Sequence, residues 1–131
     1  MDTMMKTEKK RILAVDDRAS NTRLVKLYLE GTDDYVVREE NNAQAAVHAA
    51  EEFHPHLILL DIIMPGLDGG DLAASFHANP KLRAVPIVFL TAAVTKEEIA
   101  ASGGQIGGYQ YLAKPIVLTE MVACLRHHLG G

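Results

Sequence analysis

The stretch Leu57–Gly70 reads LILLDIIMPGLDGG and contains the features that decide the fold of this 131-residue chain. Its four consecutive aliphatic residues are typical of a strand that is buried on both faces in a parallel sheet. The carboxylate of Asp61 comes directly after them, and the proline and glycines that follow turn the chain. The stretch therefore predicts a buried strand that presents a charged side chain at its carboxyl end.

Similar aliphatic runs occur in four other places: Ile12–Val15, Tyr35–Val37, Pro86–Leu90 and, more weakly, Tyr109–Leu112. None of these runs alternates cleanly between polar and apolar residues, as expected for strands covered on both faces. Segments with helical spacing of apolar residues separate the runs. This alternation predicts five strands and five helices in a three-layer α/β sandwich with right-handed crossovers.

Local signals predict where helices begin and which faces they bury. Capping boxes, in which a polar side chain at the helix start is followed three residues later by Glu or Gln, occur at Asn41 with Gln44 and at Thr95 with Glu98. The last helix has an apolar stripe that comprises Leu118, Met121, Val122, Leu125 and Leu129. For the first helix we expect a buried face that comprises Leu24, Leu27 and Tyr28.

The composition argues against several classes of protein. An apolar content of 48% predicts a folded domain, and a net charge of −4 gives no general attraction for nucleic acid, which we do not expect as a partner. The longest apolar stretch, Ala84–Val94, contains Pro86 and is shorter than the roughly 18 residues that span a membrane. With no signal-peptide core either, we expect a cytoplasmic protein without membrane contact. Cys124 is the single cysteine, and we expect it to be a buried, inert thiol in a reducing compartment.

Charged and polar residues follow most of the predicted strands, at the edge where ligands bind in an open parallel sheet. They are Asp16, Asp17, Asp61, Thr91 and Lys114, the last of which precedes Pro115. Each residue alone would be an ordinary helix cap, turn former or solvated lysine. Their joint occurrence at one edge of the sheet favours a single functional site.

Clustered carboxylates require a cation, because two unit charges about 4 Å apart repel by roughly 4 kcal/mol at an effective dielectric constant of about 20. A few oxygen ligands with room for water favour Mg²⁺, with Mn²⁺ as an acceptable substitute, whereas Ca²⁺ needs roughly six or more oxygens. Such a metal, beside an aspartate, a lysine and a threonine hydroxyl, suits phosphoryl transfer to the aspartate.

The segments ILAVDDRASN, LILLDIIMPGLDG, VPIVFLTA and YLAKPI resemble those of the receiver domains of two-component response regulators, in particular the chemotaxis-regulator-like ones. The resemblance extends over Arg11–Leu129. It implies a flavodoxin-like, doubly wound (βα)5 fold with a parallel five-stranded sheet of order 2-1-3-4-5. We therefore expect a receiver domain at residues 11–129, an N-terminal extension at residues 1–10 and a tail at residues 130–131.

The same resemblance implies which residues form the metal site. Asp61 matches the phosphoacceptor, and Asp17 with Asp61 would ligate Mg²⁺ directly while Asp16 would act through water. Ile63 matches the position whose backbone carbonyl completes the metal site.

Further matches concern the phosphoryl group and the switch. Lys114, Thr91 and the adjacent Ala92 would bind the phosphoryl group, and Tyr111 matches the aromatic residue that moves inward when the threonine hydroxyl is recruited. Pro115 matches a proline at a turn with a cis peptide bond.

The implied function is acceptance of a phosphoryl group from a sensor histidine kinase, a histidine phosphotransfer protein or a small donor such as acetyl phosphate. The domain would catalyse only its own phosphorylation and dephosphorylation and would not be a conventional enzyme. Phosphorylation would alter the face formed by helix 4, strand 5 and helix 5, which binds a downstream protein, in a monomer or weak dimer.

Two alternatives remain open at the level of sequence. One is a receiver-like scaffold that binds partners without phosphorylation. The other is a Mg²⁺-dependent phosphatase of the haloacid dehalogenase type, which forms an aspartyl phosphate. That class uses a DxD motif after its first strand, and the adjacent Asp16 and Asp17 do not form one.

Overall fold

The computed structural model describes residues 8–61, 63–64, 67–92, 97, 105–106 and 109–129. The strands are β1 (Lys10–Val15), β2 (Tyr35–Glu40), β3 (Leu57–Asp61), β4 (Ile63–Met64), β5 (Leu67–Asp68), β6 (Ile87–Thr91), β7 (Gln105–Ile106) and β8 (Tyr109–Ala113). The helices are α1 (Ala19–Glu30), the 3₁₀ helix η2 (Ala43–Ala45), α2 (Ala46–Phe53), α3 (Gly69–Ala78) and α5 (Leu118–Leu129). Among the described residues, no helix is long and apolar enough to cross a membrane.

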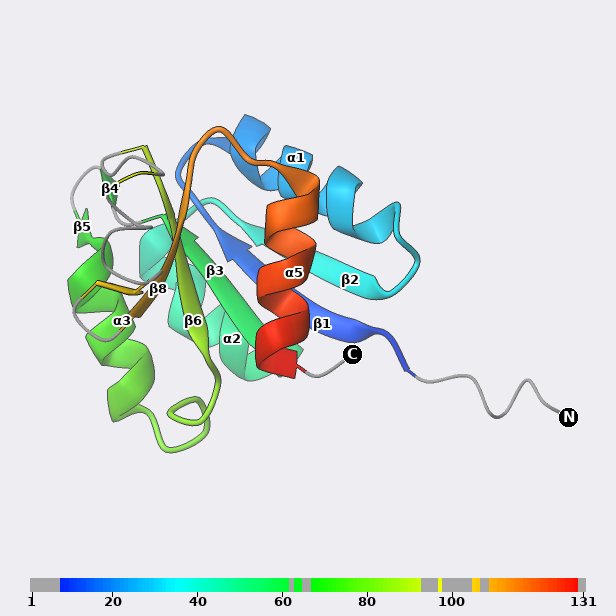
Figure 1. The fold of residues 1–131 in the computed structure, drawn as a ribbon. Coiled ribbons are helices and arrows are strands. Elements are labelled where there is room, and N and C mark those ends of the chain that lie inside the picture. Colours follow the sequence, from blue (N-terminus) through cyan, green and yellow to red (C-terminus); the bar gives the residue numbers. More distant parts are fainter. Residues whose placement is uncertain are drawn as a thin grey trace, which may run out of the picture.

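The main sheet has the strand order β2-β1-β3-β6-β8-β7 (Figure 1). Its first five strands pair in parallel and correspond to the five aliphatic runs, so the predicted order 2-1-3-4-5 is confirmed. The short β7 pairs antiparallel with β8 and adds an edge that the sequence analysis does not predict. A separate antiparallel pair, β4 with β5, follows the carboxyl end of β3.

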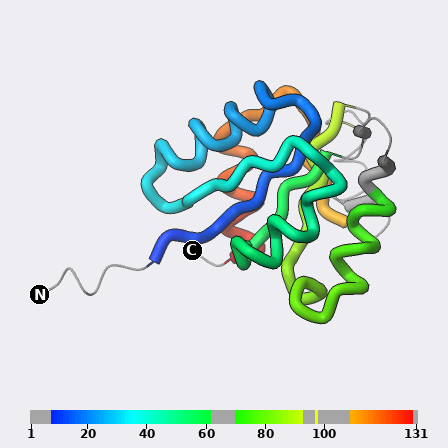
Figure 2. Tube along the Cα trace, turned by 180° about the vertical axis from the view of Figure 1, so that it is seen from behind, coloured from blue at the N-terminus to red at the C-terminus, as the bar shows by residue number. Residues whose placement is uncertain are grey.

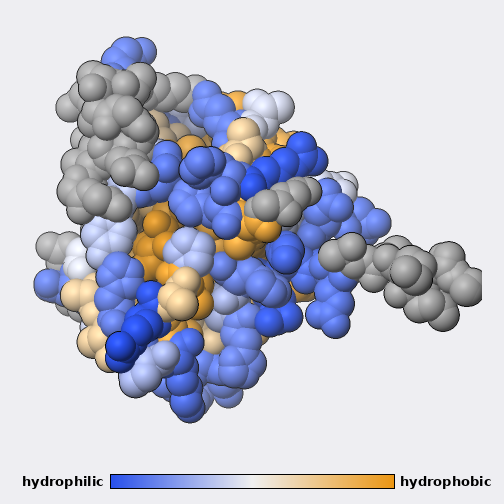
Figure 3. All heavy atoms as spheres, turned by 60° about the horizontal axis from the view of Figure 1, so that its bottom comes forward, coloured by the Kyte–Doolittle hydropathy of each residue, from blue (hydrophilic) through white to orange (hydrophobic). Residues whose placement is uncertain are grey.

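Two hydrophobic cores lie on opposite faces of the sheet, because successive strand side chains point to opposite sides. One core, which includes Phe76 and Phe89, packs under α2 and α3, and the other, which includes Leu29, Met121 and Leu125, packs under α1 and α5. Accordingly, α5 lies in front of the sheet in Figure 1 and α2 lies in front of it in Figure 2. In Figure 3, which brings the bottom of Figure 1 forward, the visible face is mostly polar at its periphery, with apolar atoms gathered near its middle. The predicted three-layer sandwich is confirmed.

The buried face of α1 differs from the prediction. Thr22, Val25 and Leu29 are buried, whereas Leu27 is 64% exposed. A residue two positions after Val25 is rotated by about 200° around a helix with 3.6 residues per turn, so Leu27 points to solvent once Val25 faces the sheet. The prediction is therefore wrong for Leu27, whereas Leu24 and Tyr28 are half-buried and Tyr28 packs against the core.

The start of the second helical segment is also displaced by one residue. The side chain of Asn42, rather than Asn41, caps η2, because its oxygen accepts a hydrogen bond from the backbone N–H of Gln44 at 3.0 Å. Asn41 instead donates to the backbone carbonyl of Asp16, 25 residues away. The capping box expected at Thr95 and Glu98 lies outside the described residues.

Cys124 is half-buried in α5 rather than fully buried. Burial raises the pKa of its thiol to about 11. The thiol is therefore protonated at neutral pH, in agreement with the expected lack of reactivity.

The ring of His56 joins the amino ends of β1 and β3. Its Nδ1 atom accepts a hydrogen bond from the backbone N–H of Arg11 at 2.8 Å, and the backbone N–H of His56 donates to the carbonyl of Arg11 at 2.7 Å. A nitrogen that accepts this bond cannot also carry a proton. Burial, together with the charges of Arg11 and Lys10, lowers the pKa of His56 below 6.5, while Glu8 acts in the opposite direction.

We predict that His56 makes the protein less stable in acid. Because the pKa of His56 is lower in the folded state, the unfolded state binds more protons in acid. The stabilisation is complete above the unfolded pKa of about 6.5 and is lost as the pH falls through that value towards the folded pKa. The His56→Asn variant keeps an acceptor near the place of Nδ1 but cannot be protonated, so its thermal midpoint should fall less between about pH 8 and pH 5.

Calorimetry at several pH values checks this prediction. The matched control is His54→Asn, because His54 contacts Arg11 through its backbone carbonyl. It should keep the pH dependence of the wild type. Identical pH profiles for His56→Asn and the wild type would contradict the prediction.

Candidate functional site

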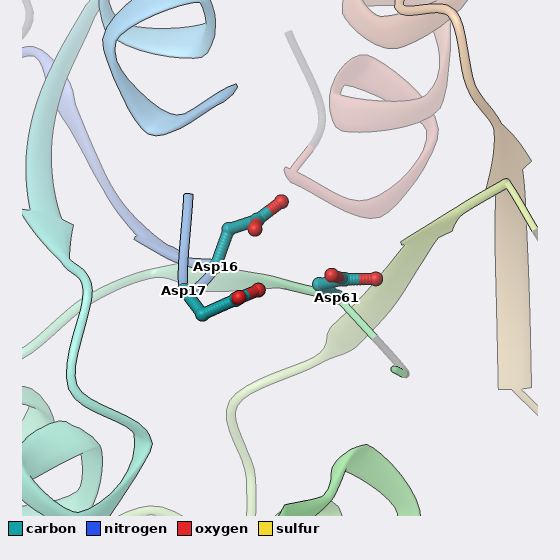
Figure 4. A group of neighbouring side chains, drawn as sticks. All are labelled: Asp16, Asp17 and Asp61. Carbon is teal, nitrogen blue, oxygen red and sulfur yellow. The ribbon is translucent and has the colours of Figure 1, made fainter. Parts of the chain in front are cut away.

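Strand register brings Asp16 and Asp61 together. Val15 of β1 pairs with Leu60 of β3, so the residues that follow each of them lie side by side at the carboxyl edge of the sheet. Asp17 is the next residue along the chain, and Figure 4 shows its carboxylate extending towards Asp61. Carboxylate oxygens of the three residues all lie within 4.8 Å of one another.

This cluster of three carboxylates is electrostatically costly. Asp16 and Asp61 are 5% and 8% exposed, whereas Asp17 is exposed. Two carboxylates at this separation repel by about 3 kcal/mol at an effective dielectric constant of about 20, and by less where water screens Asp17. The cluster therefore favours any cation that can contact more than one of its members.

Lys114 supplies one such positive charge from the far side of the site. Its Nζ atom lies 2.8 Å from Oδ2 of Asp16 and 3.7 Å from Oδ2 of Asp61. The backbone N–H of Lys114 donates to the carbonyl of Thr91 at 2.9 Å, which fixes the start of this side chain beside the end of β6. Among the charges that the described residues place in contact here, one ammonium group opposes three carboxylates, which leaves a net negative charge.

Hydrogen bonds to both the side chain and the backbone of Asp16 hold this residue in addition to Lys114. The backbone N–H of Arg18 donates to Oδ1 at 3.0 Å, and Nδ2 of Asn21 donates to Oδ2 at 3.0 Å. Nδ2 of Asn41 donates to the backbone carbonyl of Asp16 at 2.8 Å. Neither asparagine was predicted as a site residue. The contact of Asn41 with Asp16 has no local signal in the sequence, because β1 and β2 must pair before these two residues meet.

Thr91 and Tyr111 lie on adjacent parallel strands. Thr91 is fully buried and pairs in register with Ala113 of β8. The ring of Tyr111 is 8% exposed and packs on Phe89, with 5.0 Å between ring centroids. The side chain of Tyr111 is therefore buried against the core in this structure.

The remaining predicted site residues lie near the same edge of the sheet. Ala92 is exposed directly after β6. The backbone of Ile63 lies in β4, where it pairs with Asp68. The peptide bond between Lys114 and Pro115 is cis.

The donor set fits a small, hard divalent cation. Among the described residues, Asp16, Asp17 and Asp61 are the one group of carboxylate, imidazole or thiol side chains close enough to hold a metal ion. All of their ligand atoms are carboxylate oxygens, which suits Mg²⁺ or Mn²⁺. Exposure of Asp17 leaves room for water among the ligands, as Mg²⁺ usually requires.

A family model described as the response regulator receiver domain matches residues 12–126. The DNA-binding response regulator MtrA of Mycobacterium bovis is 37% identical over 131 residues, which cover 98% of this chain and 53% of that protein. The chain thus spans about half the length of the curated relatives it matches.

Two solved structures show the same architecture. The receiver domain of the sensor histidine kinase PA1611 of Pseudomonas aeruginosa, with magnesium coordinated in its active-site cleft, superimposes with a TM-score of 0.78 at 29% identity. The superposition covers 95% of this chain and 100% of the PA1611 receiver chain. The chemotaxis protein CheY4 of Vibrio cholerae gives a TM-score of 0.78 at 24% identity, covers 93% and 100% of the two chains, and supports the fold alone.

We predict that the Asp17→Asn variant is more stable than the wild type when no divalent cation is present. Removing one of the crowded charges should raise the free energy of unfolding by about 1 kcal/mol and the thermal midpoint by about 3–5 °C. Saturating Mg²⁺ should stabilise the wild type and should stabilise this variant much less, because a ligand is lost. Thermal denaturation with EDTA or with Mg²⁺ measures both effects.

The matched control is Asp34→Asn, which neutralises an exposed carboxylate in the turn before β2. This variant should respond to Mg²⁺ as the wild type does. Destabilisation of Asp17→Asn in EDTA would show that repulsion does not dominate the site.

Proposed function

The chain belongs to the response regulator receiver domain family, and on that basis we propose that Asp61 accepts a phosphoryl group with the help of Mg²⁺. The observation that carries the proposal is the cluster of Asp16, Asp17 and Asp61, with the ammonium of Lys114 in reach of two of them. We propose residues 11–129 as the extent of the receiver domain, with residues 1–10 as an extension and residues 130–131 as a tail.

In this proposal, Asp17 and Asp61 ligate the cation directly, Asp16 acts through water and the backbone carbonyl of Ile63 completes the set. The all-oxygen donor set and the magnesium-bound receiver of PA1611 support the choice of metal. Bound Mg²⁺ supplies positive charge that offsets the negative charge on the transferring oxygens. Mn²⁺ would serve as a substitute.

Phosphoryl transfer begins with attack by a carboxylate oxygen of Asp61 on phosphorus. The donor is the phosphohistidine of a sensor histidine kinase or a histidine phosphotransfer protein, or acetyl phosphate. A bond forms between this oxygen and phosphorus, the bond from phosphorus to the imidazole nitrogen or acetate oxygen breaks, and the leaving group keeps the electron pair. The proposed domain catalyses only its own phosphorylation and dephosphorylation.

Lys114, Thr91 and Ala92 then bind the new phosphoryl oxygens. Lys114 needs to move only from one acceptor to another, because its ammonium already lies between Asp16 and Asp61. Charge-assisted hydrogen bonds from the ammonium offset the charge added to Asp61. Thr91 lies one residue beyond Leu90, which pairs in register with Asp61.

The phosphorylated domain signals through β8, α5 and the helix expected after Thr95, a face that binds a downstream protein. Tyr111, which lies on β8, is the proposed link between this face and the site.

We propose a cytoplasmic monomer or weak dimer. MtrA is a DNA-binding response regulator, so the expectation that nucleic acid is excluded as a partner is not supported.

We predict that incubation with acetyl phosphate and Mg²⁺ adds one phosphoryl group to the wild-type protein, measured by intact-protein mass spectrometry. Asp61→Asn should remain unmodified, because the amide is not a nucleophile in this reaction. Lys114→Ala should react about 100-fold more slowly, since the donor that stabilises the developing charge is lost.

The matched control is Asp71→Asn in the first turn of α3, which should react like the wild type. Absence of any mass increase in the wild type would favour a phosphorylation-independent scaffold instead. Turnover of a generic phosphomonoester would favour the phosphatase.

A further inference from the structure

Asn41, which directly follows β2, is hydrogen-bonded to Asp16, the first residue of the acidic cluster. The β1–β2 ladder continues one step past β1, because the backbone N–H of Asp16 donates to the carbonyl of Glu40 at 3.2 Å. Asn41 follows directly, and its Nδ2 atom donates to the backbone carbonyl of Asp16 at 2.8 Å and to Oγ1 of Thr22 at 2.9 Å. Both amide hydrogens of Asn41 are thus used, and the backbone of Asp16 is fixed on two sides.

A buried hydroxyl anchors this amide. Thr22 is 1% exposed, and its Oγ1 atom donates to a carboxylate oxygen of Glu39 at 2.8 Å. The chain of hydrogen bonds runs from Asp16 through Asn41 and Thr22 to Glu39, and so links the ends of β1 and β2 with α1. Asp16 and Thr22 are buried, Glu39 is half-buried and Asn41 is exposed, so the network joins two buried groups through an amide at the surface. Hydrogen bonds that satisfy the buried members of such a network rigidify the groups that it joins.

Asn21 holds the carboxylate of the same aspartate, Asp16. Its Nδ2 atom donates to Oδ2 of Asp16 at 3.0 Å, and this is the oxygen that Nζ of Lys114 contacts at 2.8 Å. If Lys114 turns towards a phosphoryl group, Asn21 still satisfies that oxygen. A neutral amide can remain there without the cost of an additional charge, whereas an abandoned buried carboxylate oxygen would be costly.

We propose that Asn21 and Asn41 are positioning residues that hold Asp16 in the orientation needed for divalent-cation binding, both before and after Lys114 moves. This inference rests on the proposed function. It assigns roles to two side chains that supply no charge. Asp16 is proposed to act on the cation through water, and removal of groups in the outer shell of a metal site commonly changes the metal affinity by about 10- to 100-fold.

The test is calorimetric titration of the metal-free protein with MgCl₂. Asn41→Ala and Asn21→Ala should each raise the dissociation constant for Mg²⁺ about tenfold. Asn21→Gln keeps a donor amide and should recover part of the lost affinity. In a double-mutant cycle, Asn21→Ala should have little further effect once Asp16→Ala has removed the carboxylate that it orients.

Asn42→Ala is the matched control for Asn41→Ala, because it changes the adjacent residue in the same way. Loss of the cap of η2 should lower the thermal midpoint without altering the affinity for Mg²⁺. Equal losses of affinity in Asn42→Ala and Asn41→Ala would overturn the proposal by showing a general effect of destabilisation.

These titrations distinguish failure of the proposed function from failure of the positioning roles of Asn21 and Asn41. No binding of Mg²⁺ by the wild type would refute the proposed function. Binding by the wild type with unchanged affinity in Asn21→Ala and Asn41→Ala would leave the proposed function intact and refute the positioning roles. Because Asn21 lies on a half-buried position of α1, its variant keeps the test valid should Asn41→Ala fail to fold.

Discussion

Asp16, Asp17 and Asp61 repel one another, and the other residues of this site either offset that repulsion or hold the carboxylates in place despite it. Two of these carboxylates are buried, and strand pairing prevents β1 and β3 from separating to relieve the repulsion. Lys114 reduces the net charge, and hydrogen-bond donors from α1 and from the end of β2 hold Asp16 in place. The fold therefore maintains a group of charges that would move apart in an unfolded chain, and this is the arrangement that a divalent cation would find already assembled.

The sheet and the acidic cluster were predictable from the sequence for the same physical reason. Strands that are buried on both faces must be continuously apolar, so runs such as Leu57–Leu60 identify them without reference to their neighbours. Parallel strands then end at one edge, so the residue after each run belongs to a shared surface. Asp16 and Asp61 could be placed together on this basis before any pairing was known.

Features that depend on tertiary packing were not predictable in this way. Leu27 has the apolar character of a core residue, yet the phase of α1 is set by the packing of Val25 and Leu29 against the sheet. An asparagine before a helix can cap it or can reach a distant carbonyl, and sequence spacing does not distinguish Asn41 from Asn42. The roles of the two become distinct only after β2 has paired with β1.

Lys114 and Asp16 are separated by 98 residues, and their strands are not neighbours, since β3 and β6 lie between β1 and β8. Their ion pair thus links the carboxyl ends of β1 and β8 directly, across the two central strands of the sheet. A ligand that drew the ammonium away from Asp16 would remove this direct link between the ends of β1 and β8, and the two strands would then be joined only through their hydrogen-bonded neighbours β3 and β6.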